Sequence, residues 1–591
     1  MTLIPRRIII WQSILPKAIL ILTFPFFLVM SASYVKVYGE RGPDRLVSDD
    51  VQISGKVIDD KGVPVAGASI AVKGSGQGTN TDAAGNFSMQ VPNRNITLVV
   101  SYIGFETKEV AVPESGSVNI TLNRKDETLS DVVVIGFGTQ KKVDVTGAIS
   151  TVSAEKVNQG INQSVAHALQ GRASGVTVIQ NAGDPGGGVE IRIRGSGSIN
   201  DNSPLYVIDG VISGGISGLN PADIENISIL KDAASAAIYG SRGANGVVIV
   251  TTRKGKRDQR TNITYNASQG IQQVWRMPKA LNAAERNIIH KEALTNDGTP
   301  LSEPVWNYYN DPDHAITRTD WFKETLQTGY ISSHDLAIRG GSQRSNYSFS
   351  LGYLDNEGIV KNSNFTRYNV RFNSQHELAK NLLLGENAFI VISRQRLADT
   401  KPSYTGVLNS ALFNFRDIPV YVDKENEVYG APSGDFPNPV ALVNSRDNTA
   451  KNVNIAGNVY VEYKFLKFLT AKTYFAYNWG FLKSKNFTAM ASGGGRGLTE
   501  NSLSEGYSTT TTWIWNNTLS ADKTFDKHHI AGLIGTSAEE GINEFLNSGT
   551  ARNFSIQERA LRYFSNASTY PDHASGSADD YTLQAYFEGE L

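Results

Sequence analysis

From residue 261 onward, hydrophobic and polar positions alternate over unusually long runs. In one of them, Tyr347, Phe349 and Leu351 fall on one side, while Ser348 and Ser350 fall on the other. A period of two residues predicts β-strands with one apolar and one polar face. The clearest runs are Asn346–Leu354, Arg367–Asn373, Val453–Tyr463 and Leu469–Trp479.

The lengths of these runs and of their connections favour membrane strands. Each run approaches the roughly 9–11 residues of a tilted membrane strand, whereas strands of soluble proteins average about 5–6. Short links alternate with long ones, which is typical of an outer-membrane barrel. We count about ten strands in 261–591, the last being Tyr581–Leu591. The short links lie at about 341–345, 376–381, 464–467 and 522–527, and the long ones at about 274–331, 355–364, 394–452, 480–507 and 541–579.

Residues 52–124 show a different, shorter pattern. Alternating runs of five to seven residues are separated by turn signals, which predicts a small antiparallel β-sandwich. The runs are Gln52–Ile58, Ser69–Lys73, Asn86–Val91, Ile96–Tyr102 and Val118–Leu122. The phrases SGKVIDDKGVPVAGASIAVKG and LVVSYIGFETKEV resemble the carboxypeptidase-regulatory-like, transthyretin-type domain, which implies a module without a peptidase site.

The stretch Asn220–Gly255 reads as a compact α+β unit. Strand Ile227–Leu230 leads into a helical turn at Ala233–Tyr239, and a glycine-punctuated turn precedes strand Val247–Thr252. With RIRGSGSIN and PLYVIDGV upstream, the string resembles the plug domain of TonB-dependent outer-membrane transporters of the SusC/RagA branch, and we assign residues 141–255 to it. The resemblance rests on Arg194, Gly195, Asp209, Gly210, Lys231, Asp232, Tyr239, Gly240, Arg242, Gly243, Asn245 and Gly246.

Other features of 141–255 are interpreted structurally. Asn162 is expected to cap a helix over Gln163–Gln170. The glycine-rich run Ala182–Gly188 lacks the Gly-Lys-Ser/Thr ending of a phosphate loop, so we expect a tight turn. His167 has no second ligand at metal-binding spacing.

Residues 126–140, DETLSDVVVIGFGTQ, form a linker with a short β-prone run. The acidic Asp131 precedes four apolar residues, Val132, Val133, Val134 and Ile135. Such a segment can add as a strand to the sheet edge of a partner, or it can be the last strand of the preceding sandwich. Its resemblance to the TonB box of the family favours the first interpretation and implies TonB, with its ExbB/ExbD complex, as partner.

The composition and the motifs argue against several classes of binding site and enzyme. The net charge of −1 argues against a nucleic-acid binder held by phosphate contacts. The absence of cysteine excludes disulfides, cysteine-based metal sites, cysteine nucleophiles and lipidation of an N-terminal cysteine. No HExxH or Gly-x-Ser-x-Gly motif occurs, and His528 and His529 point to opposite faces of a strand. We therefore predict no enzyme, catalytic residue, metal or cofactor.

Residues 1–39 read as a signal peptide. Arg6 and Arg7 precede the apolar core Ala18–Met30, which Pro25 interrupts. The alternative is an uncleaved anchor, and the cleavage site is not defined by the sequence. Export agrees with the Gram-negative outer membrane that the resemblance implies.

The resemblance also sets an expected size. The family barrel has 22 strands, so about ten strands predict an incomplete barrel, and we expect the chain to be the N-terminal portion of a longer transporter. Strand number sets barrel diameter, and a closed ten-stranded barrel could not enclose a plug of about 115 residues. An open sheet edge in lipid would leave backbone groups unpaired.

The fold class is thus mainly β: a transthyretin-like sandwich, a small α+β plug and an incomplete antiparallel transmembrane β-barrel. The resemblance implies active import of an oligosaccharide or peptide, with a SusD-like surface lipoprotein as partner and outer-membrane lipid around the barrel. The alternatives are a TonB-linked signalling receptor and a truncated, non-transporting fragment. Long-loop aromatic residues could stack on sugar rings or pack the loops: Trp306, Tyr308, Tyr309, Tyr404 and Tyr429.

Overall fold

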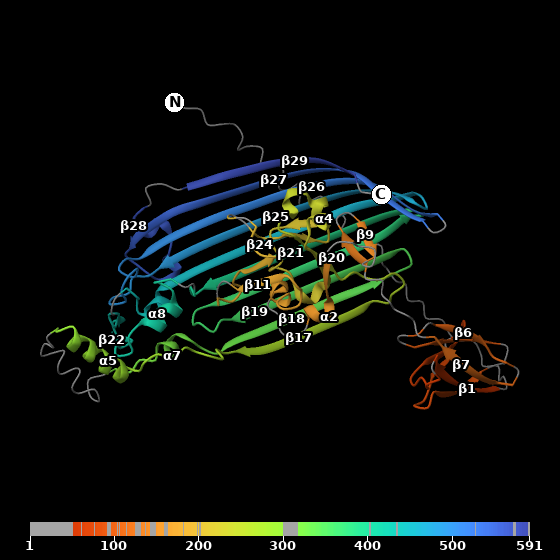
Figure 1. Cartoon of the computed structure of the whole chain (residues 1–591), viewed down its shortest axis with the longest axis horizontal. Helices are drawn as coiled ribbons and strands as arrows, with labels where there is room; N and C mark the ends of the chain where they lie inside the picture. Colours follow the sequence, from red (N-terminus) through yellow and green to blue (C-terminus); the bar gives the residue numbers. More distant parts are fainter. Residues whose placement is uncertain are drawn as a thin grey trace, which may run out of the picture. The chain divides into compact units, whose positions relative to one another are not determined.

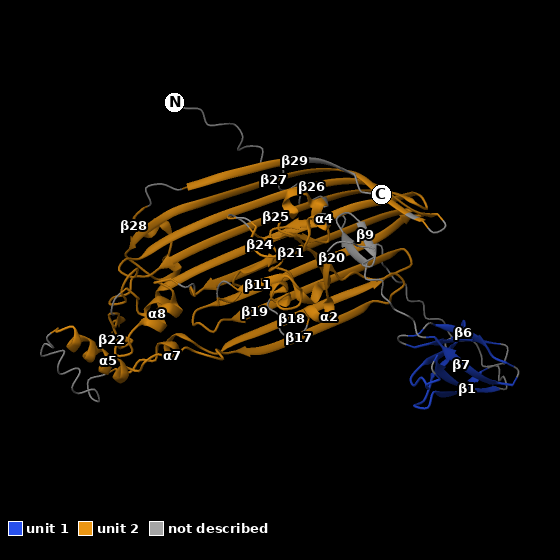
Figure 2. Ribbon diagram, viewed as in Figure 1, with its two compact units in different colours: residues 1–129 blue, residues 130–591 orange. Residues whose placement is uncertain are grey.

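The computed structural model describes residues 51–588, with internal gaps. It omits residues 61, 76, 92–95, 103–104, 106, 114, 124–131, 136–137, 142–148, 159–163, 181–182, 198, 200–201, 300–316, 401–402, 433–434, 526–527 and 571–574. The expected signal peptide, Asp131, Trp306, Tyr308 and Tyr309 therefore lie outside the described residues. The chain forms two compact units, residues 1–129 and 130–591 (Figure 2).

The first unit is a two-sheet sandwich. One sheet has the strand order β4-β1-β7 and the other β3-β2-β5-β6. Alternate residues such as Ile53, Val57, Ile70 and Leu98 are fully buried in one core. The prediction of an entirely antiparallel sandwich is wrong at one pair, because β1 and β7 run parallel. The strands are β1 Val51–Asp59, β2 Ser69–Val72, β3 Gly78–Asn80, β4 Asn86–Val91, β5 Thr97–Ser101, β6 Lys108–Ala111 and β7 Ser117–Leu122.

The second unit begins with a hairpin, β8 Val132–Ile135 and β9 Gly138–Lys141, followed by the elements that we call the plug, β10 to β16. The plug has a five-stranded sheet in the order β10-β15-β16-β13-β14 and a separate pair, β11-β12. Its strands are β10 Ile149–Ser153, β11 Val176–Gln180, β12 Val189–Ile193, β13 Leu205–Ile208, β14 Val211–Ser213, β15 Ile224–Leu230 and β16 Val247–Thr252. Its helical turns are α2 Ala154–Val157, α3 Val165–Ala168, η2 Pro221–Asp223, α4 Ala233–Ala236 and η3 Ala237–Gly243.

The short plug helix departs from its predicted bounds. Helix α3 covers only Val165–Ala168, and the hydroxyl of Ser164, rather than Asn162, accepts a hydrogen bond from the backbone N–H of His167 as its N-cap. A serine directly before the first helical residue satisfies one of the unpaired N–H groups of the first turn. Asn162 and Gln163 lie outside the described residues.

The largest element is an eleven-stranded sheet, which we call the barrel sheet (Figure 1). Ten long strands and the short β28 are joined in the order β17-β18-β19-β20-β21-β24-β25-β26-β27, with β28 and β29 both pairing β27. All its pairs are antiparallel, and none joins β17 to β29 within the described part of the chain. The strands are β17 Asn262–Gln272, β18 Gly329–Gly341, β19 Ser345–Glu357, β20 Asn364–Ala379, β21 Leu382–Leu397, β24 Arg446–Leu466, β25 Leu469–Thr488, β26 Ser502–Phe525, β27 His528–Phe554, β28 Ala567–Thr569 and β29 Ser575–Glu588.

Burial in the barrel sheet is inverted relative to a soluble protein. On β19, Ser348 and Ser350 are 4% and 5% exposed, whereas the apolar Leu351 is 39% exposed. The polar face is buried because the plug packs on it, and the apolar face is left on the outside. An apolar exterior with a polar interior is the arrangement that lipid requires of a barrel.

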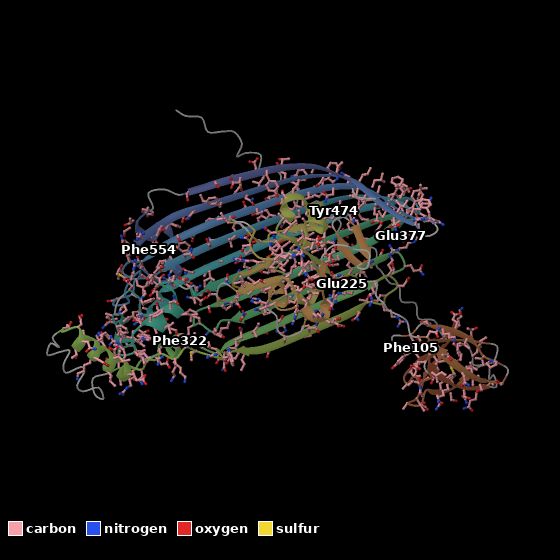
Figure 3. All side chains as sticks on the ribbon, viewed as in Figure 1. Phe105, Glu225, Phe322, Glu377, Tyr474 and Phe554 are labelled. Atoms are coloured by element: carbon pink, nitrogen blue, oxygen red, sulfur yellow. The ribbon has the colours of Figure 1, made fainter. Side chains whose placement is uncertain are left out.

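The long connections gather at one end of the barrel sheet. Phe322 and Phe554 mark this end in Figure 3, and Glu377 marks the opposite, short-turn end. Tyr429 is 5% exposed in the apolar core of the loops, so it packs the loops and does not present its ring to a ligand. No helix within the described ranges is long and apolar enough to cross a membrane. The loop elements are α5 Ala283–Asn296, α7 Trp321–Thr325, α8 Val407–Phe413, β22 Tyr421–Asp423, β23 Val428–Tyr429, α9 Pro439–Ser445, η4 Arg559–Leu561 and η5 Phe564–Asn566.

The contact between plug and barrel sheet as the candidate functional site

The plug meets the barrel sheet at a two-residue hairpin turn. Ile208 of β13 pairs directly with Val211 of β14, so Asp209 and Gly210 form the whole turn. Both residues have positive φ, 47° and 88°, which is the geometry of a type I′ turn and explains the Asp-Gly sequence. The turn points the Asp209 side chain toward the end of β16 and the inward face of β20.

Asp209 makes a buried ion pair across this contact. Its carboxylate accepts hydrogen bonds from the backbone N–H and the hydroxyl of Thr252, at 3.0 and 2.7 Å, and pairs with Arg371 of β20. The two charged side chains are 3% and 5% exposed. Burial alone would raise the pKa of Asp209, but Arg371, Lys254 and the bonds from Thr252 outweigh it, so the pKa is lowered.

Neighbouring barrel side chains donate to backbone carbonyls of the plug. Arg367 Nη1 donates to Ser217 O at 3.0 Å, and Asn369 Nδ2 donates to Gly218 O at 2.7 Å. From β24, Asn458 Nδ2 donates to Asp209 O at 3.2 Å. These bonds satisfy turn carbonyls that the barrel sheet would otherwise leave buried without partners.

A second ion pair joins the plug to β27. Arg242 Nη1 lies 2.5 Å from Glu539 Oε1, and Glu539 is 1% exposed. The Tyr581 hydroxyl of β29 donates to the same oxygen at 2.7 Å. Near β18, Asp223 lies 4.0 Å from Arg339, and burial raises the pKa of Asp223 despite this cation.

Apolar side chains complete the contact. Phe389 and Val391 of β21, Ala456, Ala476 and Ile514 belong to the same buried cluster as the plug core. The plug backbone lies close to barrel side chains at two glycines. A Cβ on Gly210 would lie 3.1 Å from the Tyr474 hydroxyl oxygen, and one on Gly218 would lie 3.4 Å from Val391 Cγ1.

The other motif residues shape the plug itself. Asp232 Oδ1 accepts the backbone N–H of Ser235 at 2.7 Å and so caps α4, and Lys231 Nζ donates to Ser174 Oγ at 3.1 Å. Tyr239 packs against the buried cluster around Val247.

Glycines of the motif allow turns and close packing. Gly240 and Gly246 have φ of 60° and 87°, and a Cβ on Gly243 would lie 2.9 Å from a backbone oxygen of α4. Arg194 and Gly195 form a turn with φ of 58° and 97°. Asn245 lies beside Gly197, where its Oδ1 would be 3.8 Å from an added Cβ.

The predicted glycine-rich turn also contacts the barrel sheet. The Asp184 carboxylate accepts from the Ala398 backbone N–H at 3.1 Å and from the Thr400 hydroxyl at 3.0 Å. A Cβ on Gly186 would lie 2.2 Å from the Phe365 ring. The turn serves packing at the loop end of β20 and β21.

The segment Val132–Ile135 forms strand β8, and its only described pairing is with β9. Within the described residues it pairs with no strand of the preceding sandwich, and both interpretations of this segment stay predictions. The described residues contain no group of three or more His, Asp or Glu side chains placed to hold a metal ion.

Sequence reasoning missed the barrel half of this site. Arg367, Asn369 and Arg371 were recognised as the polar face of a strand, but nothing in the pattern identified Asp209 or Ser217 as their partners. Glu539 gave no signal at all, because nothing in the sequence distinguishes it from the neighbouring Glu540 and Glu544 of the same strand.

Known proteins resemble this chain over most of its length. The family described as CarboxypepD_reg-like domain matches residues 53–135, and the TonB-dependent Receptor Plug Domain matches residues 141–247. The TonB-dependent receptor SusC of Bacteroides thetaiotaomicron is 35% identical over 71% of this chain and 43% of its own length. The TonB-dependent receptor P3 of Formosa agariphila is 33% identical over 91% of this chain and 51% of its own.

A solved structure of the RagAB peptide importer in the open-open state is similar with a TM-score of 0.65 and 25% identity, covering 77% of this chain and 54% of that one. The chain spans about half the length of the curated relatives it matches.

Proposed function

Because this chain belongs to the SusC/RagA-type family of TonB-dependent receptors, we propose that it supplies the plug and ten barrel strands of an active importer in the Gram-negative outer membrane. The proposed cargo is an oligosaccharide or a peptide. The similarity to a peptide importer supports the second class, and the branch to which the chain belongs supports both.

The observation that carries the proposal is the set of polar contacts by which the plug is attached to the inward face of the barrel sheet. Two ion pairs, Asp209–Arg371 and Arg242–Glu539, and several bonds to plug carbonyls hold it. When water replaces the partner, a typical hydrogen bond contributes only about 0.5–1.5 kcal/mol net. A plug held in this way blocks the path at rest, and force can release it one contact at a time.

The proposed force enters through Asp131–Ile135. Strand β8 is paired only with β9 in the described residues, which leaves its other edge open to an added strand. We assign TonB, energised by ExbB/ExbD, as the partner that contributes the added strand. A SusD-like lipoprotein is assigned to the end with the long connections.

Deletion of Asp131–Gly136 in the full-length transporter tests this assignment. Uptake of a labelled ligand is expected to fall to background with normal outer-membrane expression. A matched deletion of residues 124–129 shortens the linker equally and is expected to retain uptake. Unchanged uptake after the first deletion would refute the TonB-box assignment.

A further inference from the structure

Three cationic side chains lie directly opposite one another on the outward face of the barrel sheet. Arg394 of β21 is the register partner of Lys451 of β24, and Lys451 is the partner of Lys483 of β25. Like charges opposite one another on neighbouring strands destabilise a sheet. The arrangement therefore points to an anionic group that offsets the repulsion.

The next row of paired residues, two positions nearer the loops, adds further cations. Arg396 is the partner of Thr449, and Thr449 is the partner of Lys485. Five of these six positions on three adjacent strands are cationic, and none is acidic. We call the five cations, Arg394, Arg396, Lys451, Lys483 and Lys485, the cationic rungs.

Strand alternation fixes the face on which they lie. Asn458 of β24 and Asn478 of β25 donate to plug carbonyls, and Val391 of β21 packs in the plug core. Lys451 and Lys483 are an odd number of residues from these inward positions, as Arg394 is from Val391, so all three point outward.

Carboxylates neutralise only part of this charge. Glu505 of β26 lies 3.7 Å from Lys483 and 3.5 Å from Lys485, and Asp447 lies 3.2 Å from Arg396. Across the described residues, no ion pair involves Arg394 or Lys451, and both are exposed. The free positive charge is thus concentrated on β21 and β24, at Arg394 and Lys451.

The cationic rungs begin where the apolar outer band ends. On β24 the outward positions from Val453 to Tyr463 are apolar except Gly457, and this stretch of 11 residues matches the ~9–11 residues of a tilted strand that crosses the hydrocarbon. Lys451 is the next outward position. On β25 the same step leads from Phe481 to Lys483, and on β21 from Ile392 to Arg394.

We propose that the cationic rungs bind the phosphorylated headgroup of an outer-leaflet lipid. The inference rests on the proposed outer-membrane placement, because that placement puts the end of the apolar band at the depth of lipid headgroups. Phosphate matches the charge of the row, its oxygens accept from several Lys and Arg donors at once, and the lipid chains would lie along the adjacent apolar band.

The test uses full-length protein extracted from outer membranes in a neutral detergent. Binding of bisphosphorylated lipid A, of the same lipid after dephosphorylation, and of inorganic pyrophosphate is measured by native mass spectrometry. The triple variant Arg394→Gln/Lys451→Gln/Lys483→Gln is compared with Lys464→Gln/Lys467→Gln/Lys523→Gln, which removes three exposed cations at the short-turn end.

The triple variant of the rungs is expected to bind bisphosphorylated lipid A about a hundredfold more weakly, since each cation near an anionic headgroup contributes roughly a factor of five. The control variant should stay within about twofold of wild type. Equal binding by the two triple variants, equal binding of the dephosphorylated lipid, or pyrophosphate binding as tight as the lipid would each overturn the inference. Recovery of the wild-type protein in the outer-membrane fraction tests the proposed outer-membrane placement separately from lipid binding.

Discussion

A disulfide between Gly218 and Val391 would lock the plug to the barrel sheet. An ideal Cβ on Gly218 lies 3.9 Å from Val391 Cβ, within the ~3.5–4.5 Å range of disulfides. The nearest atom to the added Cβ is a Val391 methyl at 3.4 Å, and Gly218 has no positive φ, so Gly218→Cys fits without backbone strain. The chain has no cysteine, so Gly218→Cys/Val391→Cys introduces its only two thiols.

The size of the effect follows from the loop that the bond closes. Cross-linking positions 218 and 391 encloses about 170 residues, which corresponds to roughly 5 kcal/mol of loop-closure entropy. Replacing the buried valine by cysteine costs about 1 kcal/mol of packing. The oxidised protein should therefore be more stable than wild type, and its plug cannot leave β21 at this point.

Uptake of a labelled ligand into cells shows whether import requires the plug to move away from β21. We expect the oxidised double variant to import at less than about a tenth of the wild-type rate, because a covalent bond replaces contacts that force must break. Reduction, or either single cysteine, should restore import. Thiol labelling must show that the disulfide has formed. Near-normal import by fully oxidised protein would mean that the path opens without moving Ser217–Gly218, and the reasoning from plug attachment would be wrong.

Three further outcomes follow from the same contact. Arg371→Gln should lower the free energy of unfolding by about 3–5 kcal/mol in denaturant titrations, because it leaves the buried Asp209 carboxylate without its cation. Adding Asp209→Asn should recover part of the loss. Gly210→Ala should cost about 1–3 kcal/mol at its φ of 88°, whereas Gly214→Ala, with nothing within 4 Å of the added Cβ, should cost under about 0.5. Thermal midpoints against pH should separate the carboxyls: the lowered pKa of Asp209 gives stability that is present above 3.8 and lost as pH falls through its folded pKa, while the raised pKa of Asp223 gives stability that grows as pH falls through its folded pKa toward 3.8. Asp209→Asn should remove the acid loss and Asp223→Asn the acid gain; unchanged pH profiles in both would contradict these directions.

The sequence predicted the barrel strands well in kind and poorly in length. Val453–Tyr463 was recognised as a strand, but β24 extends over Arg446–Leu466. Hydrophobic alternation is visible only where one face meets lipid, whereas backbone pairing continues beyond it. The extension through Lys451 therefore carries no apolar signal, although it contains the cationic rungs.

In the plug, too, features that adjacent residues determine were predicted, whereas a contact between distant residues was not. Strand Val247–Thr252 was predicted with its observed bounds, since six consecutive β-prone residues follow a glycine turn. The Asp209–Gly210 turn is also local, because its sequence specifies its backbone geometry. The partner of Asp209 is not local: Arg371 lies 162 positions away, and no periodicity relates the two.

The two ion pairs act at well-separated places on the barrel sheet. Arg371 is on β20 and Glu539 on β27, with four strands between them in the sheet order. At about 4.8 Å between neighbouring strands, the two anchors are about 20 Å apart or more, beyond the distance at which side-chain energies usually couple. Each pair therefore contributes independently, and breaking one leaves the plug attached by the other and by the contact of Asp223 with Arg339 on β18. Such an attachment resists random opening, since all of its contacts must fail together, but it yields to a directed pull that breaks them in turn.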